Sequence, residues 1–362
     1  MLYLLGMTSE KLAFLKSIYL RGFICFTLAF SLVVLLGDPF INYLRNKKMD
    51  EKIRDDGPVA HISKKGTPTM GGVLIVAVLF ISNLVSADLT NPQILLLFLI
   101  TILFATIGFV DDYKKFKESK KGLSGKKKLL GQGIISVIVW LFVTKYGMTG
   151  NKVLDISIIN PINANWKLYI GGFGMLVFII IILLGTSNAV NITDGLDGLA
   201  IMPMIICSAI LSIIAYFSNH IEMSSHLNLY YINGAGEIVI YLTAICGSGL
   251  GFLWYNFYPA QLFMGDTGSL TLGGILGVVA ILLKQELILP IIGGIYVIEA
   301  LSVILQVGSF KLRGVRIFKM APLHHHFELT GLAETKVTMR FWIASFMFGI
   351  IALGIIRLRG LF

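Results

Sequence analysis

Charged residues are scarce in this sequence. They make up 14% of the 362 residues, whereas hydrophobic residues make up 56% and the mean hydropathy is +0.82. A soluble globular domain has about 25% charged and roughly 45–50% apolar residues. The composition therefore excludes an ordinary soluble protein and indicates a chain that crosses a membrane several times.

Cysteine is scarce too, and acidic residues are outnumbered by basic ones. Cys25, Cys207 and Cys246 all lie in apolar runs without metal-ligand spacing. We therefore expect reduced, packed thiols, with neither disulfides nor a zinc site. Lys and Arg number 30 against 20 Asp and Glu. Such an excess can indicate nucleic-acid binding, but membrane topology explains it better, and no nucleic-acid partner is expected.

The long apolar runs lack alternation of apolar and polar residues, which excludes the strands of a membrane β-barrel. A membrane-spanning helix needs about 20 mostly apolar residues. The ninth predicted span contains Pro290 and Gly293-Gly294 and is expected to be broken. The predicted fold is an all-α polytopic membrane protein with one integral-membrane domain, residues 1–362. Its ten predicted spans cover approximately residues 18–40, 70–87, 94–110, 132–147, 171–187, 199–217, 236–255, 269–284, 287–308 and 338–356.

Most Lys and Arg residues lie in the loops after the first, third and ninth predicted spans. Cytoplasmic loops carry an excess of positive charge. The loops after odd-numbered spans are therefore predicted to be cytoplasmic, and both termini to lie outside. Two alternating pieces, 153–160 and 166–170, flank Pro161 and predict a small outward hairpin.

The most informative stretch is Asn188-Ala-Val-Asn-Ile-Thr-Asp-Gly-Leu-Asp-Gly-Leu-Ala200, between two apolar runs. It places Asp194, Asp197 and the amides of Asn188 and Asn191 at the membrane edge, where a carboxylate is costly and indicates function. If the segment from Thr193 is helical, both aspartates lie on one face. The alternative is a polar turn with Asp as a helix cap and Gly as a helix breaker.

Asp111 and Asp112 come at the end of the third predicted span, where the helix dipole repels anions. Neighbouring helix residues point about 100° apart, so both carboxylates cannot serve one small ligand identically. Lys114 and Lys115 are sufficient to neutralise them, whereas a divalent metal is the more specific interpretation. The run Lys126–Lys128 suits an anionic substrate, although a basic loop that sets the topology explains it as well.

Two other loops have glycine and hydroxyl residues that enter a helix. In the stretch from His61 to Gly72, backbone N–H groups can face a phosphate and Lys64 or Lys65 adds charge, although Gly-Thr-Pro also makes an ordinary turn. Asp266 starts a later helix and is either an N-cap or a ligand of a hard cation. The aromatic residues around Asn256 suit stacking on a base, but aromatic residues are common at membrane interfaces.

Three consecutive histidines lie in Met320-Ala-Pro-Leu-His-His-His-Phe-Glu328. Neighbouring side chains diverge, so the three do not easily bind one metal ion. Histidines suit phosphate binding or proton transfer at neutral pH. Gln306, near the inner end of the broken ninth span, is a candidate polar contact.

These clusters converge on one predicted face of the membrane. Mg²⁺ prefers a few carboxylates together with phosphate oxygens. The combination therefore predicts a site where a soluble diphosphate meets a lipid phosphate. The five acids of this constellation are Asp111, Asp112, Asp194, Asp197 and Asp266.

The same stretches resemble those of the bacterial phospho-N-acetylmuramoyl-pentapeptide transferases, within the polyprenyl-phosphate N-acetylhexosamine-1-phosphate transferase superfamily. The resemblance covers nearly the whole chain. It is carried by Gly66-Thr-Pro-Thr-Met-Gly-Gly72, Phe109-Val-Asp-Asp112, Asn188-Ala-Val-Asn-Ile-Thr-Asp-Gly-Leu-Asp-Gly198, Met264-Gly-Asp-Thr-Gly-Ser269 and Pro322-Leu-His-His-His-Phe-Glu328.

The resemblance implies transfer of phospho-MurNAc-pentapeptide from UDP-MurNAc-pentapeptide to undecaprenyl phosphate, giving lipid I and UMP. It also implies Mg²⁺, a homodimer and a site on the cytoplasmic face of the bacterial inner membrane. Asp266 resembles the metal ligand, and Asp111 resembles the residue proposed to deprotonate the lipid phosphate, supported by Asp112. His324 resembles a further catalytic residue. The candidate substrate contacts, from the residues or from the resemblance, are Lys64, Thr69, Lys128, Asn191, Asp194, Asp197, Asn256, Phe263, Ser269, Gln306, His325 and His326.

Two other functions are compatible with these residues. One is the related transfer from UDP-GlcNAc, and the other is secondary transport, suggested by the broken ninth span. A transporter site lies near mid-membrane, whereas these acids lie at one edge. The chemical route is open as well, because Asp111 or Asp112 can also act as a nucleophile that forms an aspartyl phosphate.

Overall fold

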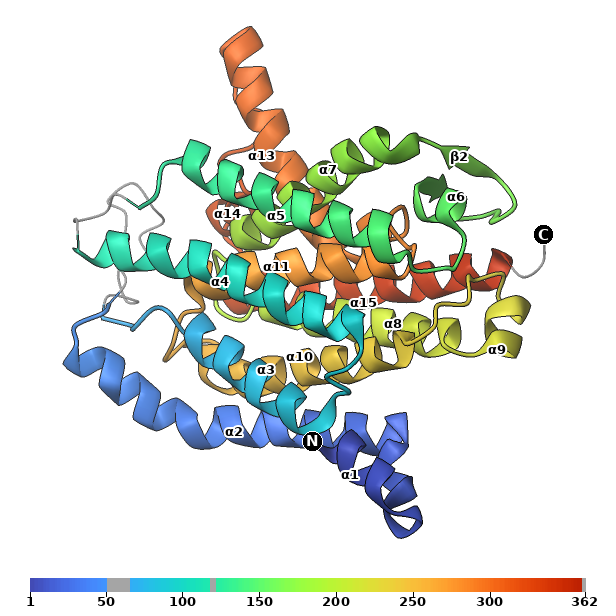
Figure 1. Cartoon of the computed structure of the whole chain (residues 1–362). Helices are drawn as coiled ribbons and strands as arrows, with labels where there is room; N and C mark the ends of the chain where they lie inside the picture. Colours follow the sequence, from blue (N-terminus) through green and yellow to red (C-terminus); the bar gives the residue numbers. More distant parts are fainter. Residues whose placement is uncertain (51–65, 118–121, 360–362) are drawn as a thin grey trace.

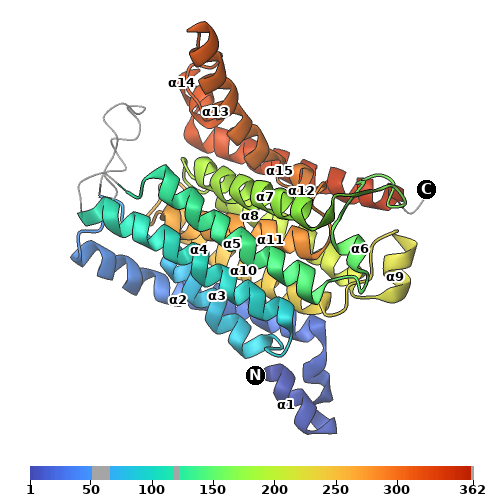
Figure 2. The same cartoon turned by 45° about the horizontal axis from the view of Figure 1, so that its top comes forward.

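The computed structural model of the chain describes residues 1–50, 66–117 and 122–359. Figures 1 and 2 show a bundle of long helices that lie roughly side by side. The all-α polytopic fold predicted from the sequence is confirmed. Within the described residues, the helices long and apolar enough to cross a membrane are nine: α2 (Ile18–Asn46), α4 (Pro92–Lys117), α5 (Gly125–Tyr146), α7 (Gly171–Thr193), α8 (Ile201–Ser218), α10 (Ala235–Asn256), α11 (Gly265–Leu282), α13 (Gly294–Arg313) and α15 (Glu334–Arg359).

The second predicted span is a shorter helix, α3 (Gly72–Ser86), of 15 residues. At 1.5 Å per residue it is about 22 Å long. It begins at a fixed point, because the N–H groups of Gly71 and Gly72 donate hydrogen bonds to Phe263 O and Met264 O. The glycine-rich start of α3 is thereby joined to the segment that leads into α11.

The ninth predicted span is broken, as expected. A four-residue helix, α12 (Leu289–Ile292), is followed by Gly293 and then by α13. Gly294 packs so closely against α15 that an added Cβ would lie 2.7 Å from the Phe348 ring. Beyond this break, α13 packs against α7, and its far end projects from the bundle together with α14 (Figures 1 and 2).

Helix α11 forms the centre of the bundle, and 94% of its most apolar 18-residue stretch is buried. It packs against α4 on one side and α7 on another. Small residues allow this close approach. A Cβ at Gly108 of α4 would lie 2.4 Å from Asp266 O, and one at Gly273 of α11 would lie 2.6 Å from Thr186 O. The start of α11 is thus pressed against the end of α4 that carries the aspartate pair.

The predicted hairpin is present but shorter than expected. Strands β1 (Ser157–Ile159) and β2 (Lys167–Tyr169) pair antiparallel, with Ser157 opposite Tyr169. The expectation that extended chain begins at residue 153 is wrong. The Asn151 side chain accepts a hydrogen bond from Val153 N and starts a helical turn, α6 (Lys152–Asp155), instead.

Met1 and Arg359 lie away from the aspartates. The amino group of Met1 donates to Leu84 O near the C-terminus of α3, and Arg359 donates to Pro161 O in the hairpin. Their placement on the outer side of the membrane stays a prediction from the Lys and Arg distribution. The remaining short helices are α1 (Leu2–Thr8), the 3₁₀ helix η1 (Glu10–Lys16), α9 (Ile221–His226) and α14 (Leu323–Leu329).

Candidate active site

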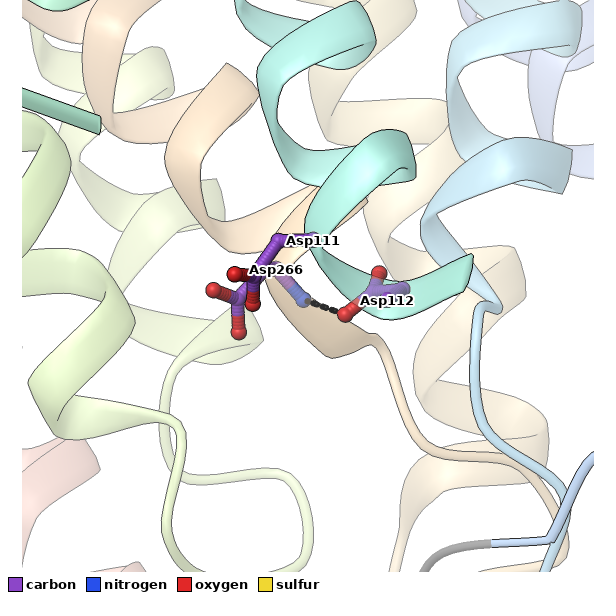
Figure 3. A group of neighbouring side chains, drawn as sticks. All are labelled: Asp111, Asp112 and Asp266. Carbon is purple, nitrogen blue, oxygen red and sulfur yellow. Dashed lines mark hydrogen bonds between the residues drawn. The ribbon is translucent and has the colours of Figure 1, made fainter. Parts of the chain in front are cut away.

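Three buried carboxylates meet where α4 and α11 touch. Asp111 and Asp112 come from α4 and Asp266 from the first turn of α11, and one oxygen of each lies within 4.8 Å of the others. Figure 3 shows Asp111 and Asp266 close together, with Asp112 on the other side of the start of α11. The expectation that α4 ends at the aspartates is wrong. The helix continues to Lys117, so the carboxylates lie inside a regular helix.

Asp112 is bound to the N-terminus of α11. Its Oδ1 accepts a hydrogen bond from Asp266 N at 3.0 Å, and its Oδ2 accepts from Thr267 N at 2.9 Å and Thr267 Oγ1 at 2.7 Å. A carboxylate at a helix N-terminus satisfies unpaired N–H groups and the helix dipole. Glycine is required at position 265, because its φ is +73° and a Cβ there would lie 2.8 Å from Asp112 Oδ2. Asp112 therefore positions Asp266.

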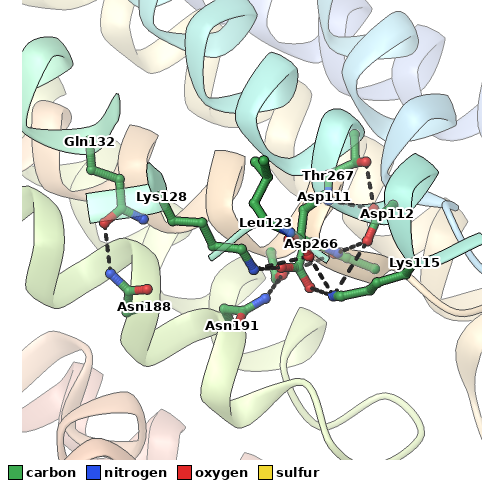
Figure 4. Close-up of polar contacts among 12 residues, drawn as sticks. Asp111, Asp112, Lys115, Leu123, Lys128, Gln132, Asn188, Asn191, Asp266 and Thr267 are labelled. Carbon is green, nitrogen blue, oxygen red and sulfur yellow. Dashed lines mark hydrogen bonds and ion pairs between the residues drawn. The ribbon is translucent and has the colours of Figure 1, made fainter. Parts of the chain in front are cut away.

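Asp111 and Asp266 instead share two lysines (Figure 4). Lys115 Nζ lies 2.7 Å from Asp111 Oδ2 and 2.8 Å from Asp266 Oδ1. Lys128 Nζ lies 3.0 Å from Asp111 Oδ2 and 2.5 Å from Asp266 Oδ2. The other oxygen of Asp111 accepts a hydrogen bond from Leu123 N at 2.6 Å. We call Asp111, Asp266, Lys115 and Lys128 the carboxylate–lysine cluster.

Helix α7 supplies amides beside this cluster. Asn191 donates to Ser269 Oγ at 2.8 Å, and Ser269 lies three residues after Asp266 in α11. One turn earlier, Asn188 donates to Gln132 Oε1 at 2.9 Å, and Gln132 lies one turn after Lys128 in α5. Figure 4 shows these contacts leading away from the carboxylates along α5 and α7.

The stretch that follows α7 is a turn. Because α7 ends at Thr193, Asp194 and Asp197 are not on one helix face, and the helical interpretation is wrong. The turn is held by side chains from elsewhere. Asp197 Oδ2 accepts from Ala260 N at 2.9 Å, and Gly198 N donates to Asn256 Oδ1 at 3.1 Å.

Helix α15 holds the same turn from the opposite side. Glu334 Oε1 accepts a hydrogen bond from Asp197 N at 2.9 Å, and Trp342 Nε1 donates to Gly198 O at 3.1 Å. Leu196 and Leu199 of the turn pack in a small apolar cluster with residues of α15. Neither Glu334 nor Trp342 was predicted from the sequence, because both lie in a helix that otherwise shows only the pattern of a membrane span.

Of the two candidates in the first loop, one lies outside the described residues and the other lies inside them. Lys64 lies outside the described residues. Thr69 is inside, and its hydroxyl lies beside Gly265, where an added Cβ would be 3.2 Å from Oγ1. Phe263 contributes backbone, since its N–H donates to Pro68 O and its carbonyl accepts from Gly71 N. The predicted glycine-rich stretch and the loop before α11 thus support each other.

Each of the three histidines has its own partner, as diverging side chains predict. His324 is fully buried and contacts Glu299 twice, through its backbone N–H and through Nδ1, both at 3.1 Å. His325 Nδ1 lies 2.8 Å from Glu328 Oε2, and His326 Nδ1 accepts from Lys319 N. Burial lowers the pKa of His324 below its ordinary value, although Glu299 opposes the shift.

His324 also contacts the turn after α7. A Cβ at Gly195 would lie 2.4 Å from His324 Nε2, and Nε2 makes no hydrogen bond within the part of the chain that the structure describes. Glu299 was missed from the sequence. The sequence did contain a signal for this residue, because a single acidic residue inside an apolar span indicates function.

Gln306 binds the loop after α13 rather than the carboxylate–lysine cluster. Its Oε1 accepts hydrogen bonds from Ile317 N and Phe318 N, and its Nε2 donates to Phe318 O, all at 2.9 Å. It therefore shapes the loop after α13. The candidates that the structure does bring together are Asp111, Asp112, Lys128, Asn191, Asp266 and Ser269.

Comparison with known proteins identifies the family. Residues 94–284 match the model of Glycosyl transferase family 4, and residues 64–76 match phospho-N-acetylmuramoyl-pentapeptide-transferase signature 1. A phospho-N-acetylmuramoyl-pentapeptide-transferase of Fusobacterium nucleatum subsp. nucleatum is 65% identical over 361 residues, which cover 100% of both chains. The chain belongs to the phospho-N-acetylmuramoyl-pentapeptide transferase family. As a member of this family it is a phosphotransferase enzyme with several membrane spans, and the transporter interpretation is wrong.

Proposed function

We propose that the chain transfers phospho-MurNAc-pentapeptide from UDP-MurNAc-pentapeptide to undecaprenyl phosphate, giving lipid I and UMP for peptidoglycan synthesis. The observation that carries this proposal is the carboxylate–lysine cluster at one end of a membrane-spanning bundle, in a chain of this transferase family. Transfer of a phosphoryl-linked group depends on positioning and charge neutralisation more than on covalent chemistry of the protein. Paired acids and lysines at the membrane edge suit that task.

The cation of the site is proposed to be Mg²⁺, held by Asp266 with Asp111. The fit rests on the donor set, because three buried carboxylates offer oxygens within 4.8 Å of one another, and carboxylates are the ligands of hard cations. Both oxygens of Asp112 accept hydrogen bonds from the start of α11, so Asp112 positions Asp266. When bound, the ion would neutralise the diphosphate and improve UMP as a leaving group.

Asp111 is proposed to receive the acceptor phosphate. Its carboxylate is held by Leu123 N and by two ammonium groups, so it is fixed in one orientation. A phosphate monoester with a second pKa near 6 is largely dianionic at neutral pH, which leaves little proton to remove. Positioning the acceptor is therefore the main role we assign to Asp111. A covalent route with Asp111 or Asp112 as the nucleophile is the alternative, and in either case the attacking oxygen has to leave a present partner.

The donor is proposed to bind along the turn after α7 and the loop before α11. Asn191, Ser269 and Asn256 lie on the elements that form this region. We further propose a homodimer in the bacterial inner membrane, with the site facing the cytoplasm and one integral-membrane domain over residues 1–362. The proposed substrate contacts are Lys64, Thr69, Lys128, Asn191, Asp194, Asp197, Asn256, Phe263, Ser269, Gln306, His325 and His326, with His324 as a further catalytic residue.

The test is UMP release by the detergent-purified protein with UDP-MurNAc-pentapeptide, with and without undecaprenyl phosphate, and with EDTA. We expect release only when donor, lipid and divalent cation are all present. Release with UDP-GlcNAc and none with UDP-MurNAc-pentapeptide would overturn the donor and keep the chemistry. Release that persists in EDTA would overturn the cation.

A further inference from the structure

The two ammonium groups of the carboxylate–lysine cluster lie on the oxygens that a divalent cation would use. Lys115 contacts Asp266 Oδ1 at 2.8 Å and Asp111 Oδ2 at 2.7 Å. Lys128 contacts the other oxygen of Asp266 at 2.5 Å. Figure 4 shows both lysine side chains reaching the same two carboxylates. Both oxygens of Asp266 and one oxygen of Asp111 are therefore in contact with a positive charge.

These contacts compete directly with metal binding. Mg²⁺ binds oxygens at about 2.0–2.1 Å, and an ammonium that bridges two carboxylates cannot stay beside it, because cations a few ångströms apart repel strongly in partly buried surroundings. Formal charge leads to the same conclusion. The two carboxylates of the cluster already balance its two ammonium groups, so a divalent ion would add an uncompensated double positive charge unless a lysine leaves.

The two lysines differ in how easily they can leave. The Lys115 side chain is 43% exposed and lies in the last turns of α4, whereas the Lys128 side chain is 19% exposed. A lysine ammonium sits on a flexible four-carbon stem and reaches new partners by changing rotamer. Lys115 is therefore the lysine whose ammonium moves away from the carboxylates.

We propose that Lys115 and the divalent cation compete for the same oxygens of Asp111 and Asp266. When the cation binds, the Lys115 ammonium leaves Asp111 and Asp266 and moves to the phosphates of the donor. This inference rests on the proposed function, which supplies the cation and the diphosphate. From the sequence, Lys115 was expected only to neutralise the neighbouring aspartates. The proposal makes it a functional residue of the site.

Metal affinity tests the competition without turnover. The detergent-purified full chain is titrated with Mn²⁺ in the absence of substrate, and free Mn²⁺ is followed by electron paramagnetic resonance. Lys115→Met is expected to bind Mn²⁺ at least about tenfold more tightly than the wild type, since one neighbouring charge changes proton affinity of a carboxylate by a similar factor. Lys117→Met is the matched control, because its ammonium lies over the Tyr113 ring on the same helix. It is expected to bind like the wild type.

Asp266→Asn separates this inference from the proposed function. If Asp266→Asn loses Mn²⁺ binding and Lys115→Met binds no more tightly than the wild type, the Lys115 inference is wrong and the metal assignment stands. If Asp266→Asn binds Mn²⁺ like the wild type, the metal assignment itself falls. Binding of UDP at saturating Mn²⁺ then tests where the ammonium goes. We expect several-fold weaker binding for Lys115→Met, and unchanged binding would remove the proposed move to the phosphates.

Discussion

Asp111 and Asp112 are adjacent in the sequence, yet their carboxylates have different partners. Asp112 accepts three hydrogen bonds from the first turn of α11, whereas Asp111 faces Lys115 and Lys128. The helical geometry of neighbouring residues predicts this divergence. It does not predict which of the two meets α11, because that depends on how α4 rotates as it packs against α11.

Replacing Asp112 is expected to reduce stability as well as activity. In Asp112→Asn, an amide group replaces one carboxylate oxygen and the remaining oxygen is neutral. The buried N–H and O–H donors at the start of α11 would then lose their charged acceptor. This loss should lower the free energy of unfolding by about 2–4 kcal/mol. Thermal unfolding in detergent measures this loss of stability. Asp266→Asn is the control, since its carboxylate contacts two lysines and caps no helix, and a larger loss there would contradict this role of Asp112.

His324 predicts a pH dependence of stability. Burial lowers its pKa in the folded protein, whereas in the unfolded chain it has the ordinary value of about 6.5. As pH falls below about 6.5, the unfolded chain binds the proton first, so stability is lost on the acid side and is fully present above that value. Melting temperatures at pH 5.5 and 7.5 should therefore differ less in His324→Gln than in the wild type. The exposed His226→Gln control should keep the wild-type difference.

At the scale of elements, the turn after α7 derives its conformation from its neighbours. Its own sequence, with two glycines and two aspartates, is compatible with several backbone paths. Asn256 of α10, Glu334 and Trp342 of α15, and Ala260 of the loop before α11 select one of them. The proposed donor side is thus coupled to α10 and α15, which contribute none of Asp111, Asp112 and Asp266.

Removing one of these contacts is expected to weaken donor binding. Trp342→Phe keeps an aromatic ring and loses the hydrogen bond to Gly198 O. A hydrogen bond of about 1 kcal/mol corresponds to an approximately fivefold rise in KM for the donor, with KM for undecaprenyl phosphate unchanged. Trp254→Phe, on an exposed part of α10, should leave both values unchanged. An equal rise for both substrates would point to a general loss of structure.

The contact between Gly195 and His324 can be tested from the glycine side. In Gly195→Ala the new methyl group would overlap Nε2 and force the His324 ring or the turn to move. Activity should fall at least about tenfold although no predicted site residue is changed. Gly185→Ala adds the same methyl group in α7 where no atom from elsewhere in the described chain lies within 4 Å, and its activity should stay normal. Normal activity in both variants would show that this contact is unimportant.

At the scale of the whole molecule, α11 is the common support. It is buried along most of its length, and its first turn carries Asp266 against α4, α5 and α7. The hairpin and the C-terminal end of α15 lie at the opposite end of the bundle (Figure 1), and Met1 contacts the C-terminal end of α3. A site at one end of such a bundle faces only one side of the membrane.

Labelling of introduced cysteines tests which side that is. Lys127→Cys lies at the exposed start of α5 near the carboxylates, and Lys152→Cys lies in exposed α6 near the hairpin. With a membrane-impermeant maleimide on intact spheroplasts, we expect labelling of position 152 only, and of both positions after permeabilisation. The three native cysteines are buried and serve as an internal background. The reverse pattern would overturn the predicted orientation.

Composition and motif spacing in the sequence were enough to determine the class of fold, the order of the apolar segments, the break in the ninth span and the family, although the second of the ten predicted spans is a helix of only 15 residues. Long apolar runs dictate membrane helices because each helix satisfies its own backbone in lipid. Only the tertiary structure decided that Asp112 supports α11, that Asp194 lies in a turn, and that Lys115, Glu299 and Glu334 join the site. These facts depend on contacts between segments far apart in the chain. Such contacts are set by helix packing and rotation, which no local pattern records.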